Sequence, residues 1–369
     1  MLRLGIAVSL VTFFAAAKKV TAAPHRGRAN RPTRIQDSTK AQPKENPMKK
    51  TIVAYKALPS DIEAYLRKTA DVVNVDPNDH AAFVAALKTA DGAIGASVKI
   101  TPDMIEGATK LKALSTISVG YDQFDVDDLT RRSIVLTHTP DVLTESTADT
   151  VFALILASAR RVVELAEWVK QGHWKSSIGE ACFGVDVQGK TLGIVGLGRI
   201  GGAVARRAAL GFRMNVLYTN RSANEQAERE FGAKRVGLDE LLAQSDFVCL
   251  QVPLTQQTRG LIGADELKKM KPSAILINAS RGPTVDENAL IEALKNGTIR
   301  GAGLDVFEQE PLPADSPLIA MKNVVALPHI GSATHETRHA MARNAAENLI
   351  GALDGTLTQN IVNRDALGR

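Results

Sequence analysis

From Met48 onward, short apolar runs alternate with segments whose apolar residues recur at helical spacing. Short apolar or β-branched runs are typical of buried strands, and spacings of three and four residues are typical of helices. Such an alternation predicts a parallel sheet with helices on both faces. The predicted strands are Thr51–Tyr55, Ala93–Ala96, Ala113–Ile117, Val135–Thr137, Thr191–Val195, Asn215–Tyr218, Phe247–Gln251, Ala274–Asn278, Gly303–Val306 and Val324–Ala326.

Helical spacing fills most of the intervals between these runs. A helix is predicted over Ser60–Thr69, with Ser60 as its N-cap because Glu63 follows three residues later. A long helix is predicted over Glu145–Trp168, leading from the first group of strands to the second. The last predicted helix, His335–Leu353, has apolar spacing suited to packing back on the first group. Shorter helices are predicted from Gly201 to Leu210 and over Asp239–Ala243, Ala264–Met270 and Glu287–Asn296.

The composition is that of an ordinary folded protein. Hydrophobic residues make up 44% and charged residues 23% of the chain, which excludes the disordered class. Two cysteines, Cys182 and Cys249, cannot form a disulfide scaffold or a four-cysteine metal site. We expect each to be a small buried apolar residue in a reducing compartment.

The first 47 residues differ from the rest. They include Leu4–Ala17, fourteen residues without a charge, whereas a membrane-spanning helix needs about 20 apolar residues. A basic start and an apolar run resemble a secretory signal, but Lys18 and Lys19 interrupt the approach to a cleavage site. Because Met48 directly precedes the first strand, we expect residues 1–47 to be an over-extended start or a dispensable leader of a cytoplasmic protein. Export and another targeting role are the alternatives.

The net charge of +5 originates in this leader. Residues 1–47 hold nine of the 45 basic and two of the 40 acidic residues, which leaves 36 basic and 38 acidic residues in the remaining chain. The remaining chain is therefore slightly acidic and does not indicate a basic surface for nucleic acid. We expect neither nucleic acid nor a membrane as a partner.

One glycine motif has the context that its chemistry requires. It follows the predicted strand Thr191–Val195 and precedes a helix, as in folds that bind dinucleotides. The first glycine permits a tight turn, the second lets a pyrophosphate approach the backbone, and the third lets helix and strand pack closely. Free N–H groups at the start of the helix would hold the phosphates. The residues of this predicted nucleotide loop are Gly196, Leu197, Gly198, Arg199, Ile200 and Gly201.

The end of the next strand distinguishes between the two nicotinamide cofactors. An NAD-binding fold usually has Asp or Glu there, which binds the adenine ribose hydroxyls. This chain instead has Asn220, Arg221 and Ser222, without a carboxylate. Asn220 and Ser222 can donate hydrogen bonds, and the guanidinium of Arg221 suits a 2′-phosphate. We therefore predict that NADP(H) is preferred, with NAD(H) as the alternative.

These patterns predict an α/β protein of two domains, which suits 369 residues at about 100–200 residues per domain. The nucleotide domain would be a doubly wound parallel sheet of the Rossmann type over residues 147–330. A second, smaller, flavodoxin-like α/β domain for the substrate would comprise residues 48–146 and 331–369.

Three charged side chains, Arg281, Glu310 and His329, each come shortly after one of the last three predicted strands. Because the carboxyl ends of parallel strands meet at the edge where such sheets bind ligands, we expect the three side chains to lie close together. A carboxylate next to an imidazole raises the imidazole pKa and fixes the ring. A guanidinium can hold a 2-keto acid through its carboxylate and carbonyl oxygens. These are the predicted catalytic residues, and no His or Cys spacing predicts a metal site.

Together these residues resemble the D-isomer-specific 2-hydroxyacid dehydrogenase family, and the resemblance extends from about Tyr55 to Asn363. Its signature segments correspond to Gly196–Gly201, Asn278–Pro283, Gly303–Pro311 and Pro328–Ser332, in the family's order. Within the family, the chain is most similar to the glyoxylate/hydroxypyruvate reductase B (2-ketogluconate reductase) group. The segments that carry this likeness are Tyr55–Pro59, Ser115–Tyr121, Gly303–Leu312 and Pro328–Arg338.

The resemblance implies hydride transfer to glyoxylate, hydroxypyruvate or 2-keto-D-gluconate in a homodimer that pairs through the nucleotide domain. By position, Arg281 would bind the substrate carboxylate, His329 would donate the proton and Glu310 would be its partner. It also implies carboxylate binding by backbone amides near Ala96, Ser97 and Gly120, and a nicotinamide and pyrophosphate path along Pro253, Thr258, Ala279, Ser280, Asp305 and Gly331.

Two other functions compete with this interpretation. Corepressor-like regulatory proteins of the same fold sense NAD(P)H and can retain all three charged side chains, but the reductase-like segments favour an enzyme. Other enzymes of the fold differ at single positions. Formate dehydrogenases have Gln where Glu310 stands, and phosphoglycerate dehydrogenases usually have an acidic residue near Thr219 or Asn220.

Overall fold

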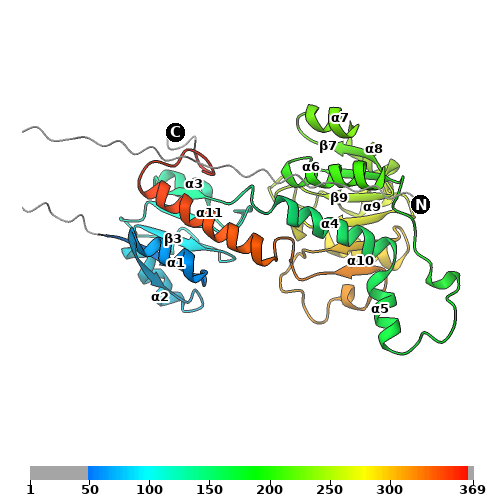
Figure 1. Cartoon of the computed structure of the whole chain (residues 1–369), viewed down its shortest axis with the longest axis horizontal. Helices are drawn as coiled ribbons and strands as arrows, with labels where there is room; N and C mark the ends of the chain where they lie inside the picture. Colours follow the sequence, from blue (N-terminus) through cyan, green and yellow to red (C-terminus); the bar gives the residue numbers. More distant parts are fainter. Residues whose placement is uncertain (1–48, 365–369) are drawn as a thin grey trace, which may run out of the picture. The chain divides into compact units, whose positions relative to one another are not determined.

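The computed structural model describes residues 49–364, so the prediction for the leader 1–47 lies outside the described residues. The first part of the described chain forms a five-stranded parallel sheet (Figure 1). Its strands are β1 (Lys50–Ala54), β2 (Ala70–Asn74), β3 (Gly92–Gly95), β4 (Ala113–Thr116) and β5 (Val135–Thr137). Their order across the sheet is β2-β1-β3-β4-β5.

The second sheet has seven parallel strands. They are β6 (Thr191–Val195), β7 (Asn215–Thr219), β8 (Lys234–Arg235), β9 (Phe247–Leu250), β10 (Ile275–Asn278), β11 (Gly301–Leu304) and β12 (Val324–Ala326). The order β12-β11-β10-β9-β6-β7-β8 starts at β6 in the interior and grows first to one side and then to the other. The carboxyl ends of β6 and β9 therefore flank a switch point, the place where doubly wound sheets bind their ligands.

Helices cover both faces of each sheet. They are α1 (Ser60–Arg67), α2 (His80–Thr89), α3 (Val126–Arg131), α4 (Thr144–Ala159), α5 (Val162–Lys170), α6 (Arg199–Arg206), α7 (Glu225–Phe231), α8 (Leu238–Gln244), α9 (Ala264–Lys269), α10 (Glu287–Lys295) and α11 (His335–Leu353). On the five-stranded sheet, α1 and α11 bury one face and α2 and α3 the other (Figure 1). On the seven-stranded sheet, α4 and α6 bury one face and α8, α9 and α10 the other. The fold is therefore the predicted α/β class with a doubly wound sheet.

All ten predicted strands are present, each within two residues of its predicted ends. The last helix packs against β3 and β4, as its apolar spacing predicted. The sequence interpretation missed the edge strands β2 and β8 and the helices α2, α3 and α7. An edge strand has one neighbour and buries less of its surface, so its apolar pattern is weaker.

The predicted long helix Glu145–Trp168 is wrong, because the structure divides it into α4 and α5. The break lies at Arg161, whose φ of 55° is in the left-handed region and cannot continue a right-handed helix. The Arg161 guanidinium stabilises the break by bonding Glu164 and the carbonyl oxygen of Ala181. That carbonyl lies twenty residues along the chain, beyond the reach of local periodicity.

Three smaller expectations are also corrected. Ser60 is the first residue of α1 and not its cap; the cap position is Pro59, and its carbonyl oxygen accepts from Ile62 and Glu63. The helix after the glycine motif begins at Arg199 and continues into one turn of π-helix. Cys249 is buried and burial raises its thiol pKa to about 12, whereas Cys182 is only partly buried.

Between residues 49 and 364, none of the helices combines the length and apolarity that crossing a membrane requires.

Candidate active site

The glycine loop between β6 and α6 has the geometry that a dinucleotide requires. Gly196 has a φ of 100°, and a Cβ there would lie 2.6 Å from the Gln251 carbonyl oxygen. A Cβ on Gly201 would collide with the Gly196 carbonyl oxygen, so helix and strand could not pack as they do. A Cβ on Gly198 would point into open space, which leaves the backbone free for close approach of a ligand. The loop therefore fits a pyrophosphate by its backbone shape.

Beside this loop lies a cleft of about 1370 Å³. It is lined by residues that follow β3, β4 and β5 of the first sheet and β6, β9, β10, β11 and β12 of the second. Among the predicted site residues, those that line it are Ala96, Ser97, Gly120, Gly198, Arg199, Ile200, Gly201, Pro253, Ala279, Ser280, Arg281, Asp305, Glu310, His329 and Gly331.

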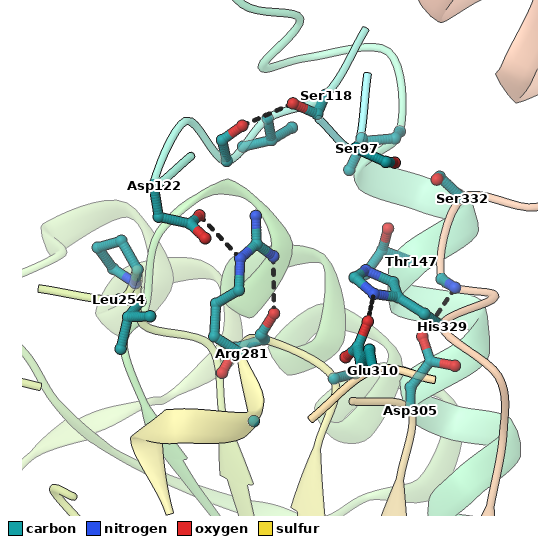
Figure 2. A pocket seen from close by; sticks show the side chains of 18 of the residues that line it. Ser97, Ser118, Asp122, Thr147, Leu254, Arg281, Asp305, Glu310, His329 and Ser332 are labelled. Carbon is teal, nitrogen blue, oxygen red and sulfur yellow. Dashed lines mark hydrogen bonds and ion pairs between the residues drawn. The ribbon is translucent and has the colours of Figure 1, made fainter. Parts of the chain in front are cut away.

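The three predicted catalytic residues follow neighbouring strands, as expected. Arg281 comes after β10, Glu310 after β11 and His329 after β12, and these strands are adjacent in the sheet. Figure 2 shows the Arg281 guanidinium and the His329 imidazole pointing into the same cleft, with Ser97 and Ser118 across from them. Parallel pairing thus brings together side chains that lie far apart in the sequence.

His329 and Glu310 form a hydrogen-bonded pair. The His329 Nδ1 atom lies 2.7 Å from Glu310 Oε2 (Figure 2). An ionised carboxylate only accepts hydrogen bonds, so Nδ1 carries the hydrogen and the other ring nitrogen, Nε2, is left for a ligand. His329 has a φ of 54°, a strained backbone conformation of a kind that clusters at functional sites.

Glu310 is held ionised by its surroundings. Partial burial raises its pKa, but the hydrogen bond and charge of His329, the Phe307 N–H and the charge of Arg281 together outweigh burial and lower the pKa below its usual range. Phe307 N donates to Glu310 Oε1 at 3.1 Å. The carboxylate is therefore a fixed acceptor that orients the imidazole.

Asp305 holds the backbone that directly follows His329. It is 1% exposed, and its two carboxylate oxygens accept from Ile330 N at 2.7 Å and Gly331 N at 2.8 Å. Burial raises the pKa of Asp305, against the lowering effect of the two backbone N–H groups and of His329. Both carboxylate oxygens of Asp305 therefore bind the backbone after His329. From the sequence, Asp305 was predicted to lie beside the nicotinamide, and this structural role was not predicted.

The backbone of Arg281 is fixed by Asn278 and Thr284. The Asn278 side-chain amide and the Thr284 hydroxyl both donate to the Arg281 carbonyl oxygen, at 3.0 and 2.6 Å. Asn278 Oδ1 in turn accepts from the backbone N–H and hydroxyl of Ser280. The guanidinium therefore extends from a rigid turn directly after β10.

Across the cleft, Asp122 contacts this guanidinium, a contact that the sequence interpretation missed. Arg281 Nε donates to Asp122 Oδ1 at 3.0 Å (Figure 2). Arg281 Nη1 donates to the Ser280 carbonyl oxygen at 2.8 Å. A Cβ on Gly120 would collide with Arg281 Nη2, so the Gly120 backbone lies directly against the guanidinium. Asp122 and Gly120 share the loop after β4; the resemblance pointed to the Gly120 backbone amide but not to Asp122.

The predicted cofactor residues outside the cleft lining have other positions. Leu197 is buried, and Asn220, Arg221 and Ser222 form the turn after β7. Thr258 bonds within its own loop, donating to the Pro253 carbonyl oxygen at 2.6 Å. No carboxylate occurs in the Asn220–Ser222 turn, so the residues present fit a 2′-phosphate. In the described range 49–364, no group of three or more His, Cys, Asp or Glu side chains is placed to hold a metal ion.

The chain is similar to known reductases. A family model described as "D-isomer specific 2-hydroxyacid dehydrogenase, NAD binding domain" matches residues 152–331. A glyoxylate/hydroxypyruvate reductase B of Yersinia pestis (strain Pestoides F) is 57% identical over 323 residues, which cover 87% of this chain and 99% of the relative.

Two solved structures extend the likeness to three dimensions. An NADPH-dependent glyoxylate/hydroxypyruvate reductase of Sinorhizobium meliloti, in complex with NADP and malonate, is 33% identical with a TM-score of 0.77, over 85% of this chain and 97% of that one. A glyoxylate reductase of Paecilomyes thermophila is 29% identical with a TM-score of 0.79, over 86% of this chain and 99% of that one.

Proposed function

The chain belongs to the D-isomer specific 2-hydroxyacid dehydrogenase family, and from this premise we propose that it reduces glyoxylate and hydroxypyruvate to the corresponding 2-hydroxy acids, in the D form where the product is chiral, with NADPH as the preferred hydride donor. It is an oxidoreductase. The observation that carries the proposal is the 2.7 Å pair of His329 and Glu310, next to Arg281 and the glycine loop in one cleft.

In the proposed mechanism, Arg281 and the backbone around Gly120 hold the substrate carboxylate and orient the carbonyl. When bound, the nicotinamide would supply the hydride to the substrate's carbonyl carbon, which leaves the former carbonyl oxygen as an alkoxide. His329 Nε2 then gives its proton to that oxygen, while Glu310 holds Nδ1 and stabilises the charged ring before transfer. Ala96 and Ser97, at the end of β3, complete the carboxylate site from the opposite wall.

The glycine loop and the turn after β7 would hold the cofactor. Gly198 and the N-terminus of α6 fit the pyrophosphate, and Arg221 fits the 2′-phosphate of NADPH. Pro253, Ala279 and Ser280 line the route toward the catalytic residues, and Thr258 is expected to fix that route by holding the Pro253 loop. A charge-assisted contact between Arg221 and the 2′-phosphate, worth roughly 1.5–3 kcal/mol, would favour NADPH over NADH by about 10–150-fold.

We infer a homodimer from one exposed apolar region. The helix α5 has no buried residue, and Val162 and Val163 on it are 52% and 46% exposed. Trp174 and Phe183, in the segment that follows, are 62% and 53% exposed. Exposed apolar patches of this kind mark interaction sites, and we assign this one to a second copy of the chain.

The test of the proposed function is NADPH oxidation by the full chain with hydroxypyruvate, glyoxylate and 2-keto-D-gluconate, and with NADH as the control donor. We expect turnover with hydroxypyruvate and glyoxylate and a clear preference for NADPH. Turnover of 2-keto-D-gluconate would add a polyhydroxylated acid to the substrates. A protein that binds NADPH but turns over none of these acids would favour the regulatory, corepressor-like alternative.

The proposed two-domain division, 48–146 with 331–369 and 147–330, and a cytoplasmic location remain predictions. Limited proteolysis tests the division, since cleavage is expected at the exposed residues Asp141 and Val142 before α4 rather than within either sheet.

A further inference from the structure

We propose that Arg235 determines cofactor specificity together with Arg221, by holding the turn that carries Arg221 and by adding a second guanidinium beside it. This inference rests on the proposed NADPH preference and deepens it. Arg235 lies on the two-residue strand β8, which the sequence interpretation missed.

The contacts of Arg235 fix the backbone of the turn. Arg235 Nη2 donates to the carbonyl oxygens of Asn220 at 2.9 Å and of Arg221 at 2.8 Å. Its Nε donates to the Asn220 oxygen as well, at 3.2 Å. Parallel pairing sets this geometry, because Arg235 is the β8 partner of Tyr218 near the end of β7. One planar guanidinium thus holds two successive peptide groups.

The same turn is tied to the glycine loop from its other end. Asn224 N donates to the Tyr218 hydroxyl at 2.8 Å, and the Asn224 side-chain amide donates to the Leu197 carbonyl oxygen at 3.1 Å. Leu197 belongs to the predicted nucleotide loop. The turn is therefore fixed at both ends relative to the loop that fits the pyrophosphate, so Arg221 has a defined starting point for contact with the ribose.

Within residues 49–364, the guanidinium groups of Arg221 and Arg235 are not held in salt bridges. Neither Arg221 nor Arg235 forms an ion pair with any carboxylate of the described chain, and the carbonyl groups that Arg235 contacts are uncharged. Glu228 on α7 instead accepts the Tyr218 hydroxyl at 2.5 Å. Two unpaired guanidinium groups at one turn create a site for a phosphate carrying up to two negative charges near neutral pH.

Lys234 provides a matched control for this assignment. It precedes Arg235 on β8, is also exposed to solvent and carries the same charge. Successive side chains on a strand point to opposite sides, and Lys234 makes no hydrogen bond to the turn. Removing its charge therefore changes the net charge by the same amount without releasing the carbonyl oxygens.

The experiment measures binding of NADPH and of NADH to the full chain by nucleotide fluorescence, without a keto acid. We expect Arg235→Met to weaken NADPH binding by about tenfold or more. NADH binding should change by no more than about twofold, the usual range for surface substitutions, which also shows that the variant folds. Lys234→Met should leave both affinities within about twofold. Arg235→Lys keeps the positive charge but lacks the planar guanidinium that donates to both carbonyl oxygens, and we expect it to lose part of the NADPH affinity.

Several results would overturn the inference. An unchanged ratio of NADPH to NADH affinity in Arg235→Met would remove Arg235 from specificity, and an equal loss in Lys234→Met would reduce its effect to net charge. Wild-type affinity in Arg235→Lys would show that holding the carbonyl groups is irrelevant. These outcomes are separate from failure of the proposed function: a wild-type chain that binds both nucleotides equally refutes the NADPH preference itself, and this inference with it.

Discussion

The two walls of the cleft around the cofactor site work by different physical means. The glycine loop contributes backbone shape: a left-handed turn at Gly196 and an absent side chain at Gly198. The other part of the cleft, called here the catalytic wall, consists of Arg281, Glu310 and His329. It contributes side chains, and these are held by groups from other segments of the chain. The loop that fits the pyrophosphate is thus built from six consecutive residues, whereas the catalytic side chains depend on contacts between distant segments.

The largest expected effect comes from the catalytic wall. His329→Ala should lower kcat by about 10²–10⁴-fold, the usual range for loss of a general acid, because the variant lacks the positioned imidazole that gives its proton to the alkoxide. Binding of NADPH, measured by fluorescence titration, should be unchanged. This result would show that catalysis by His329 and nucleotide binding by the glycine loop are separate. The control is His335→Ala at the exposed start of α11. A variant at His329 with full activity would exclude this residue from proton transfer.

The glycine loop is tested with two neighbouring glycines of one helix. Gly201→Ala places a methyl group against the Gly196 carbonyl oxygen, and such overpacking costs about 1–3 kcal/mol. We expect lower thermal stability and NADPH binding weakened by about tenfold or more. Gly202→Ala, one residue along, meets nothing within 4 Å and should have neither effect. Equal behaviour of the two variants would contradict the backbone-shape explanation.

The contact across the cleft predicts a smaller, selective effect. Asp122→Ala frees the Arg281 guanidinium, and ordering such a side chain on substrate binding costs about 1–2 kcal/mol. The KM for hydroxypyruvate should therefore rise about tenfold, with the KM for NADPH unchanged. Asp127→Ala on the adjacent helix α3 serves as the control for loss of a carboxylate. A lower KM in Asp122→Ala would instead mean that Asp122 competes with the substrate for Arg281.

The smallest effect concerns stability and pH. The pKa of Glu310 is lowered in the folded protein, so the stability it contributes is present above the ordinary glutamate pKa of about 4.3 and is lost as the pH falls through the lowered value. Denaturant unfolding should show that Glu310→Gln is less stable than wild type near pH 7. The difference in unfolding free energy between the two proteins should shrink as the pH is lowered. The difference in unfolding free energy should be modest because the Glu310 and His329 side chains are 36% and 48% exposed. A difference that widens in acid would have the wrong sign for this account.

Local chemistry explains what could be predicted from the sequence. Apolar periodicity identified ten strands, and the spacing of glycines identified the nucleotide loop, because both signals lie within a few consecutive residues. The positions of Arg281, Glu310 and His329 after successive strands were enough to bring them to one edge, since parallel pairing follows from the alternation of strands and helices.

Tertiary structure alone decided the contacts that hold those residues in place. Arg281 and Asp122 are 159 residues apart, and at the break in the long predicted helix the Arg161 guanidinium bonds a carbonyl group twenty residues away. Arg235 reaches the Asn220–Arg221 turn only because β8 pairs with β7. Hydrogen bonds of this kind join segments whose separation in sequence carries no periodic signal. Local sequence therefore determined the central strands and the glycine loop, whereas the contacts that hold the site residues in place form only when the elements pack.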